Sequence, residues 1–201
     1  TVSSTWLGDI NISLANYAST DGVTGVTLSS IGPLTANYSV TLSSYNDTVT
    51  IGKTSTTAGP TITAGAGTAD TLNMTVGAGF RDLDDITGFE TINMAITAGD
   101  SITIGANADE LDGIVGAKSL VITGGNAVST LTLGSTNDKL TGTTLLNVDA
   151  SAFAGKLVAT YDAEALGNAL RAQAIKGSET NAFDVVIGTY DSASTASAAD
   201  K

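Results

Sequence analysis

Aspartates beside glycine-rich turns are the residues of this chain whose types and spacing suggest chemistry. Asp47, Asp70, Asp100 and Asp138 each stand two residues before an apolar residue. Carboxylate oxygens are hard ligands, and a protein-bound Ca²⁺ takes about six to eight oxygens. These four aspartates are therefore the first candidates for calcium ligands.

Three segments approximate a glycine- and aspartate-rich nonapeptide, Gly-Gly-x-Gly-x-Asp-x-apolar-x, that binds calcium between coils of a parallel β-roll. They are residues 44–49, 65–72 and 134–140. None is complete, because the glycines of 65–72 are displaced by one residue and most glycines of 134–140 are replaced. An aspartate at this position can also cap the turn before a strand and oppose edge-to-edge pairing. Both interpretations stay open.

The densest acidic cluster is formed by residues 81–85 and then Glu90, and its carboxylates Asp82, Asp84 and Asp85 are further candidates for metal binding. The alternative is a solvated loop face, which is what charge clusters usually form. Paired carboxylates are also the tools of glycoside hydrolysis. The chain has no histidine and no cysteine, however, which removes the Ser-His and Cys-His types of nucleophile activation. We therefore expect no enzyme.

A short phrase recurs through the chain: an acidic residue, a small residue, then alternating apolar positions that run toward glycine. It appears at 47–52, 70–77, 90–96 and 100–105, and variants with a basic or neutral first residue occur at 118–124 and 129–134. Imperfect repeats of a short strand and a turn are typical of stacked β-structure. We predict an all-β fold, a parallel β-helix or irregular β-solenoid. The alternative is a set of antiparallel β-sandwich domains.

Four regions are expected along the chain. An N-terminal β region covers 1–60, the solenoid repeat covers 61–161, a short helix and a final strand occupy 162–190, and residues 191–201 form a linker or frayed tail. The helix is expected after Asp162, a plausible N-cap, and before Gly177. The period-2 pattern predicts which side chains point into the solenoid: Leu72, Met74, Val76, Ile92, Met94, Ile96, Ile102, Ile104, Leu120, Ile122, Leu131, Leu133, Leu146, Val148, Leu157 and Ala159.

The composition narrows the classes of partner. The formal net charge is −12, which argues against a nucleic-acid partner because phosphates require a basic face. No run approaches the roughly 20 apolar residues of a membrane span. Absent cysteines fit an exported bacterial protein, and the small-residue ending suggests a segment of a longer chain. We expect an extracellular location.

Three stretches resemble the repeat regions of bacterial surface-layer (S-layer) proteins and related secreted surface proteins of the repeats-in-toxin (RTX) type. They are residues 69–74, 86–94 and 145–159, which include Gly-Phe-Glu-Thr-Ile-Asn and Val-Asp-Ala-Ser-Ala-Phe-Ala-Gly. The resemblance covers about residues 65–160. It implies secretion, calcium-dependent folding and self-assembly on the bacterial cell surface.

The function expected from these features is structural. The chain would be a segment of a secreted S-layer protein that assembles with itself and with calcium into a lattice, with a cell-surface polysaccharide as a second partner. The alternatives are a calcium-dependent RTX-type adhesin module that binds a glycan or host surface, and a polysaccharide-cleaving β-helix.

Overall fold

A computed structural model describes most of the central part of the chain. The described residues are 10–14, 27–31, 38–54, 61–80, 83, 85–106, 111, 117–135, 147–161, 175–176 and 183–187. Within them the chain forms strands and turns and no helix, and every strand pairing is parallel. The predicted all-β fold with a β-solenoid is therefore confirmed.

The strands form three sheets. The seven-stranded sheet has the order β14-β12-β10-β8-β6-β4-β2, and two four-stranded sheets have the orders β1-β3-β5-β7 and β15-β13-β11-β9. The strand bounds are β1 Ile10–Ser13, β2 Thr27–Ile31, β3 Tyr38–Thr41, β4 Thr48–Thr54, β5 Thr61–Thr63, β6 Thr71–Val76, β7 Ile86–Thr87, β8 Thr91–Ile96, β9 Ser101–Ile104, β10 Ser119–Gly124, β11 Thr130–Leu133, β12 Asn147–Phe153, β13 Lys156–Tyr161, β14 Ile175–Lys176 and β15 Phe183–Ile187.

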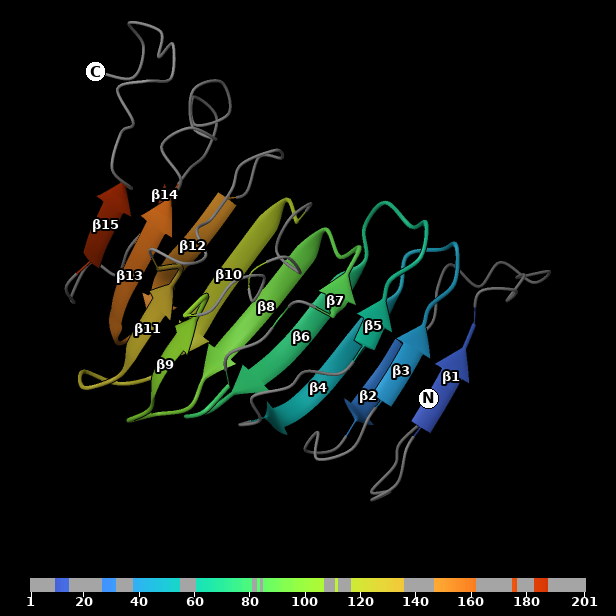
Figure 1. Cartoon of the computed structure of the whole chain (residues 1–201), viewed down its shortest axis with the longest axis horizontal. Helices are drawn as coiled ribbons and strands as arrows, with labels where there is room; N and C mark the ends of the chain where they lie inside the picture. Colours follow the sequence, from blue (N-terminus) through green and yellow to red (C-terminus); the bar gives the residue numbers. More distant parts are fainter. Residues whose placement is uncertain are drawn as a thin grey trace, which may run out of the picture.

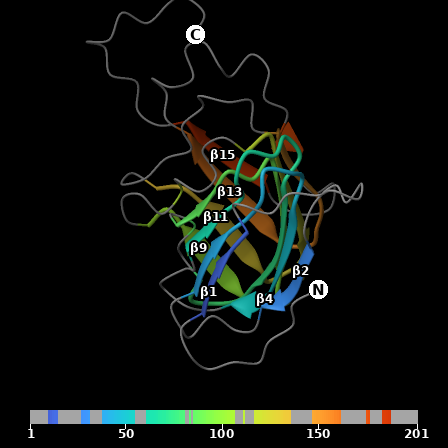
Figure 2. The same cartoon turned by 90° about the vertical axis from the view of Figure 1, so that its right-hand side faces the viewer.

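The sheets lie in two layers, and the strands succeed one another along the long axis from blue to red (Figure 1). Viewed along that axis, β2 and β4 of the seven-stranded sheet lie on one side, and β1, β9, β11, β13 and β15 lie on the other (Figure 2). A chain that alternates between two layers pairs each strand with the next coil's equivalent strand, and the result is parallel pairing.

The connections between the layers differ clearly in length only after β8. There, short turns lead from the end of the long sheet into the second four-stranded sheet, as in β8 to β9, β10 to β11 and β12 to β13, and longer connections lead back, as in β9 to β10 and β11 to β12. In the first half, the connection from β3 to β4 (residues 42–47) is as long as the one from β4 to β5 (residues 55–60). Short turns therefore stack at one edge of the long sheet in the second half.

The core is a single apolar cluster between the layers. Alternation along β6 and β8 buries every second residue, as the period-2 pattern predicts. The predicted inward set is confirmed for all its members except Leu146, which lies outside the described residues. The sequence pattern did not single out three phenylalanines that are also fully buried, namely Phe80, Phe89 and Phe153.

The structure bears on the predicted regions at residue 60 and after residue 161. The long sheet runs without interruption past residue 60, because β4 pairs with β6. The final strand expected near residues 183–187 is present as β15. The helix expected between Asp162 and Gly177 lies mostly outside the described residues, but Ile175 and Lys176 at its end form β14, where extended pairing with β12 replaces helix. The tail at 191–201 lies outside the described residues.

Candidate functional site

The parallel register places three acidic residues one above another at the start of the long sheet. Thr48, Thr71 and Thr91 are aligned partners in β4, β6 and β8, so the residues before them, Asp47, Asp70 and Glu90, also stack. We call these three residues the acidic ladder. The Thr71 amide donates to the Asp47 carbonyl at 2.8 Å, and the Thr91 amide donates to the Asp70 carbonyl at 3.1 Å.

Each carboxylate of the acidic ladder receives a backbone N–H. The Asp47 amide donates to Oδ1 of Asp70 at 2.6 Å, and the Asp70 amide donates to Oε2 of Glu90 at 2.8 Å. The Asp47 carboxylate accepts the amide of Ser43 at 2.8 Å and also its hydroxyl. Carboxylates thereby satisfy amides at a sheet edge, where an unpaired buried N–H would destabilise the fold.

Two of the three residues of the acidic ladder are buried. Asp47 is 1% exposed and Asp70 is 0% exposed. Within the described part of the chain, Oδ2 of Asp70 is buried and has no hydrogen-bond partner. Burial raises the pKa of Asp70 by disfavouring the charged form, the hydrogen bond from Asp47 opposes this, and the negative charges of Glu90 and Asp47 raise the pKa further.

Gly67 seals the Asp70 carboxyl group on one side. A Cβ at position 67 would lie 2.5 Å from Oδ2 of Asp70 and 2.5 Å from the Tyr45 carbonyl oxygen. Only glycine therefore lets the backbone approach this closely. The same turn is fastened by Asn46, whose Oδ1 accepts the amides of Thr68 and Ala69 at 3.0 and 3.1 Å.

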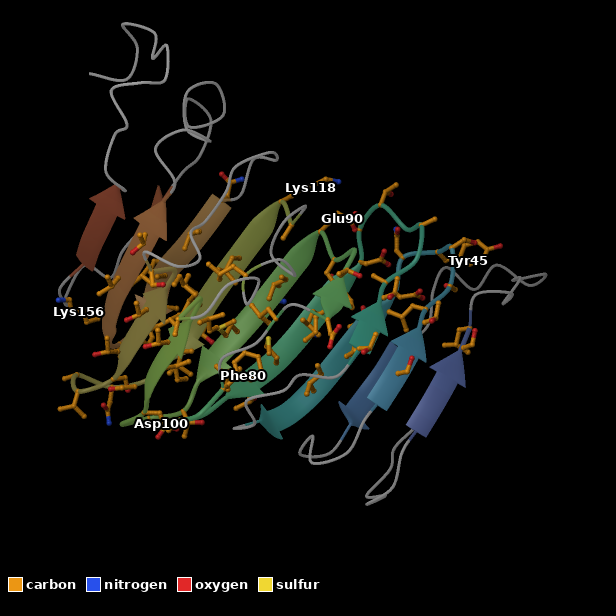
Figure 3. The ribbon with its side chains drawn as sticks, in the orientation of Figure 1. Tyr45, Phe80, Glu90, Asp100, Lys118 and Lys156 are labelled. Atoms are coloured by element: carbon orange, nitrogen blue, oxygen red, sulfur yellow. The ribbon has the colours of Figure 1, made fainter. Side chains whose placement is uncertain are left out.

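A second row of three stacked residues lies at the opposite edge of the solenoid. Ser101, Thr130 and Lys156 are aligned in β9, β11 and β13, so Asp100, Ser129 and Gly155 stack before them. Oγ of buried Ser129 accepts the amides of Gly99 and Asn126, both at 2.9 Å. Figure 3 shows Glu90 and Lys118 at one edge of the solenoid and Asp100 at the other.

The predicted metal ligands do not come together in one site. Asp47 and Asp70 come together in the acidic ladder, Asp100 lies at the opposite edge, and the side chain of Asp85 is exposed. Asp82, Asp84 and Asp138 lie outside the described residues. Among the residues that the structure describes, no three acidic side chains are grouped so that they could hold a metal ion.

The sequence places Glu90 after the acidic cluster of residues 81–85 and outside the predicted metal ligands, whereas the structure places it in the acidic ladder. The repeat pattern already indicates this position, because Glu90-Thr-Ile92 repeats the pattern Asp70-Thr-Leu72. The ladder does not continue with an acid, since the next aligned position is Lys118, whose amide donates to the Glu90 carbonyl at 2.8 Å.

Comparison with protein-family models, curated proteins and solved structures finds no match to this chain. No helix within the described ranges is long and apolar enough to cross a membrane. Function is therefore inferred from the geometry of the site.

Proposed function

We propose that this chain is a structural segment of a secreted bacterial surface-layer protein and that it assembles with calcium into a cell-surface lattice. One observation carries the proposal: the outer face that β6, β8 and β10 form in the long sheet is uncharged, in a chain of net charge −12. Its outward side chains are Thr71, Asn73, Thr75, Thr91, Asn93, Ala95, Ser119, Val121 and Thr123.

An uncharged, ordered face favours contact between copies. Copies of a strongly acidic chain repel one another, so approach is least unfavourable where charge is absent. The face is also held in place by side-chain hydrogen bonds across strands. The side-chain amide of Asn93 donates to Oδ1 of Asn73 at 2.8 Å, and the side-chain amide of Asn73 donates to the Thr50 hydroxyl at 3.5 Å. Side chains that are already ordered lose less entropy on contact.

Calcium is part of the proposal because the chain is strongly acidic. Divalent cations relieve repulsion between acidic molecules, and calcium accepts oxygens from more than one chain. In the acidic ladder, Asp47 and Asp70 already accept backbone amides. We therefore assign calcium to carboxylates other than these two.

The test is assembly of the purified chain, followed by light scattering and electron microscopy in calcium, in magnesium and in chelator. We expect particles larger than dimers in calcium, because lattices need contacts that do not close. A chain that stays monomeric at every calcium concentration contradicts the proposal.

Two variants with the same charge change localise the contact. Thr75→Asp places a carboxylate on the uncharged face, and Thr103→Asp places one on exposed β9 in the opposite layer. We expect Thr75→Asp to abolish calcium-dependent assembly and Thr103→Asp to preserve it. Assembly lost only in Thr103→Asp would move the contact to the other layer.

A further inference from the structure

The carboxyl group of Asp70 is satisfied on one oxygen only. Oδ1 accepts the Asp47 amide at 2.6 Å, whereas Oδ2 is buried and has no hydrogen-bond partner in the described part of the chain. The side chain is 0% exposed. A charged oxygen without water or a donor is strongly disfavoured in such a place.

The charged groups that act on Asp70 are themselves acidic. Asp47 faces it from the turn before β4, and Glu90 faces it from the turn before β8. Gly67 lies against the carboxyl group, because a Cβ at this position would be 2.5 Å from Oδ2 and 2.6 Å from Oδ1. If Asp70 were ionised, three negative charges would stand in adjacent coils, each disfavouring the others.

We infer that Oδ2 of Asp70 binds a proton from solution in the folded solenoid and that this proton holds the acidic ladder together. The proton removes the central negative charge and leaves Oδ1 free to accept the Asp47 amide. It also turns Oδ2 into a hydrogen-bond donor. The ladder is thereby a pH-sensitive element of the fold, which goes beyond the assembly proposed above.

The direction of the pH effect follows from linkage. The pKa of Asp70 is raised in the folded state, so the folded chain holds this proton over a pH range in which the unfolded chain has lost it. The stabilisation is fully present below the ordinary aspartate pKa of about 3.9. It is lost as the pH rises through the folded-state pKa. Other carboxylates also titrate, so the effect is measured as a difference between variants.

The experiment compares urea unfolding of the full chain with that of Asp70→Asn and Asp85→Asn between acidic and neutral pH. Asparagine mimics the neutral acid at position 70, and Asp85→Asn makes the same charge change at an exposed side chain. We expect the urea midpoint of Asp70→Asn to exceed the wild-type midpoint at neutral pH, and the gap to narrow toward acidic pH. Asp85→Asn should show no such narrowing. Parallel curves for all three proteins overturn the inference.

Carbon NMR of wild-type chain labelled at aspartate Cγ tests the same point without relying on a variant. We expect the Asp70 carboxyl to titrate above the ordinary aspartate pKa of about 3.9, and a midpoint at or below that value overturns the inference. Added calcium distinguishes a metal from a proton. Stabilisation by calcium at neutral pH that disappears in Asp70→Asn would mean that calcium occupies this place and would also overturn it.

Discussion

The backbone amide of Asp47 donates a 2.6 Å hydrogen bond to the Asp70 carboxylate, across a sequence separation of 23 residues. The bond joins two turns that precede neighbouring strands of the long sheet. It links the sequence motif to the solenoid, because the acid that opens one repeat satisfies the amide of the acid that opens the preceding repeat. The motif therefore acts between coils as well as within its own turn.

Removing the acceptor in this bond should expose the Asp47 amide to exchange. Asp70→Ala removes this acceptor from a buried N–H, and the loss of such a hydrogen bond destabilises folds by about 1–3 kcal/mol. Asp70→Asn keeps Oδ1 and should keep the bond. Amide hydrogen exchange measures both effects: the Asp47 amide should lose protection in Asp70→Ala and retain it in Asp70→Asn. Equal protection in the two variants would show that the bond contributes little.

The strand register can be tested with neighbouring residues of β9. Ile104 is 0% exposed and Thr103 is exposed on the outer surface. Ile104→Ala should lower the free energy of unfolding by about 2–5 kcal/mol, because it deletes packed methyl groups from a core that collapses only in part. Thr103→Ala should change it far less. Urea unfolding of both variants measures the difference, and a larger loss for Thr103→Ala would contradict the register.

The sequence predicted the inward side chains and the solenoid because both depend on local pattern. Alternation in β6 identified Leu72, Met74 and Val76 without knowledge of any partner strand. Contacts between coils depend on register, which varying coil lengths conceal. Asp70 bonds Asp47 across 23 residues and Glu90 across 20. For this reason the aspartates were identified individually, while their stacking with Glu90 was not.

Two other features could not be predicted from the local sequence pattern. The stacking of the short turns that follow β8, β10 and β12 becomes visible only when the strands are paired. The burial of Phe153 depends on Gly155, in the turn that directly follows it, and on Gly125, in the turn after β10. A Cβ at Gly125 would lie 2.6 Å from its ring, and a Cβ at Gly155 would lie 2.5 Å from it. Glycine spacing along the chain gives no indication of this packing.

Ser129 should matter more than an ordinary surface serine. Its hydroxyl oxygen accepts the amides of Gly99 and Asn126, and the residue is 1% exposed. Ser129→Ala leaves two amides without this acceptor, so we expect a loss of about 2 kcal/mol or more in the free energy of unfolding. Ser151→Ala, at an exposed serine of β12 whose hydroxyl donates to Asp149 Oδ1 in the same strand, is the control. Similar losses in both variants would contradict the bridging role of Ser129.

Alanine substitutions at two glycines distinguish the free-energy cost of a left-handed backbone conformation from the cost of steric crowding. Gly99 and Gly105 have φ of 84° and 88°, where a side chain adds about 1–2 kcal/mol. A Cβ at Gly99 meets nothing closer than 4.0 Å, whereas one at Gly105 would lie 2.8 Å from Leu111 Cδ1 and 2.9 Å from Gly134 Cα. Gly99→Ala should therefore show the backbone cost alone.

Gly105→Ala should add a steric penalty to that backbone cost, because Gly134 belongs to the neighbouring coil. Its amide bonds the Ile104 carbonyl at 2.8 Å, so it cannot move away without straining the β9–β11 pairing. We expect the free energy of unfolding of Gly105→Ala to fall below that of Gly99→Ala by at least about 1 kcal/mol, the lower range for an overpacked site. Thermal and urea unfolding of the two variants measure this difference. Equal losses would show that the coils separate easily at this point and that their close approach is not needed for stability.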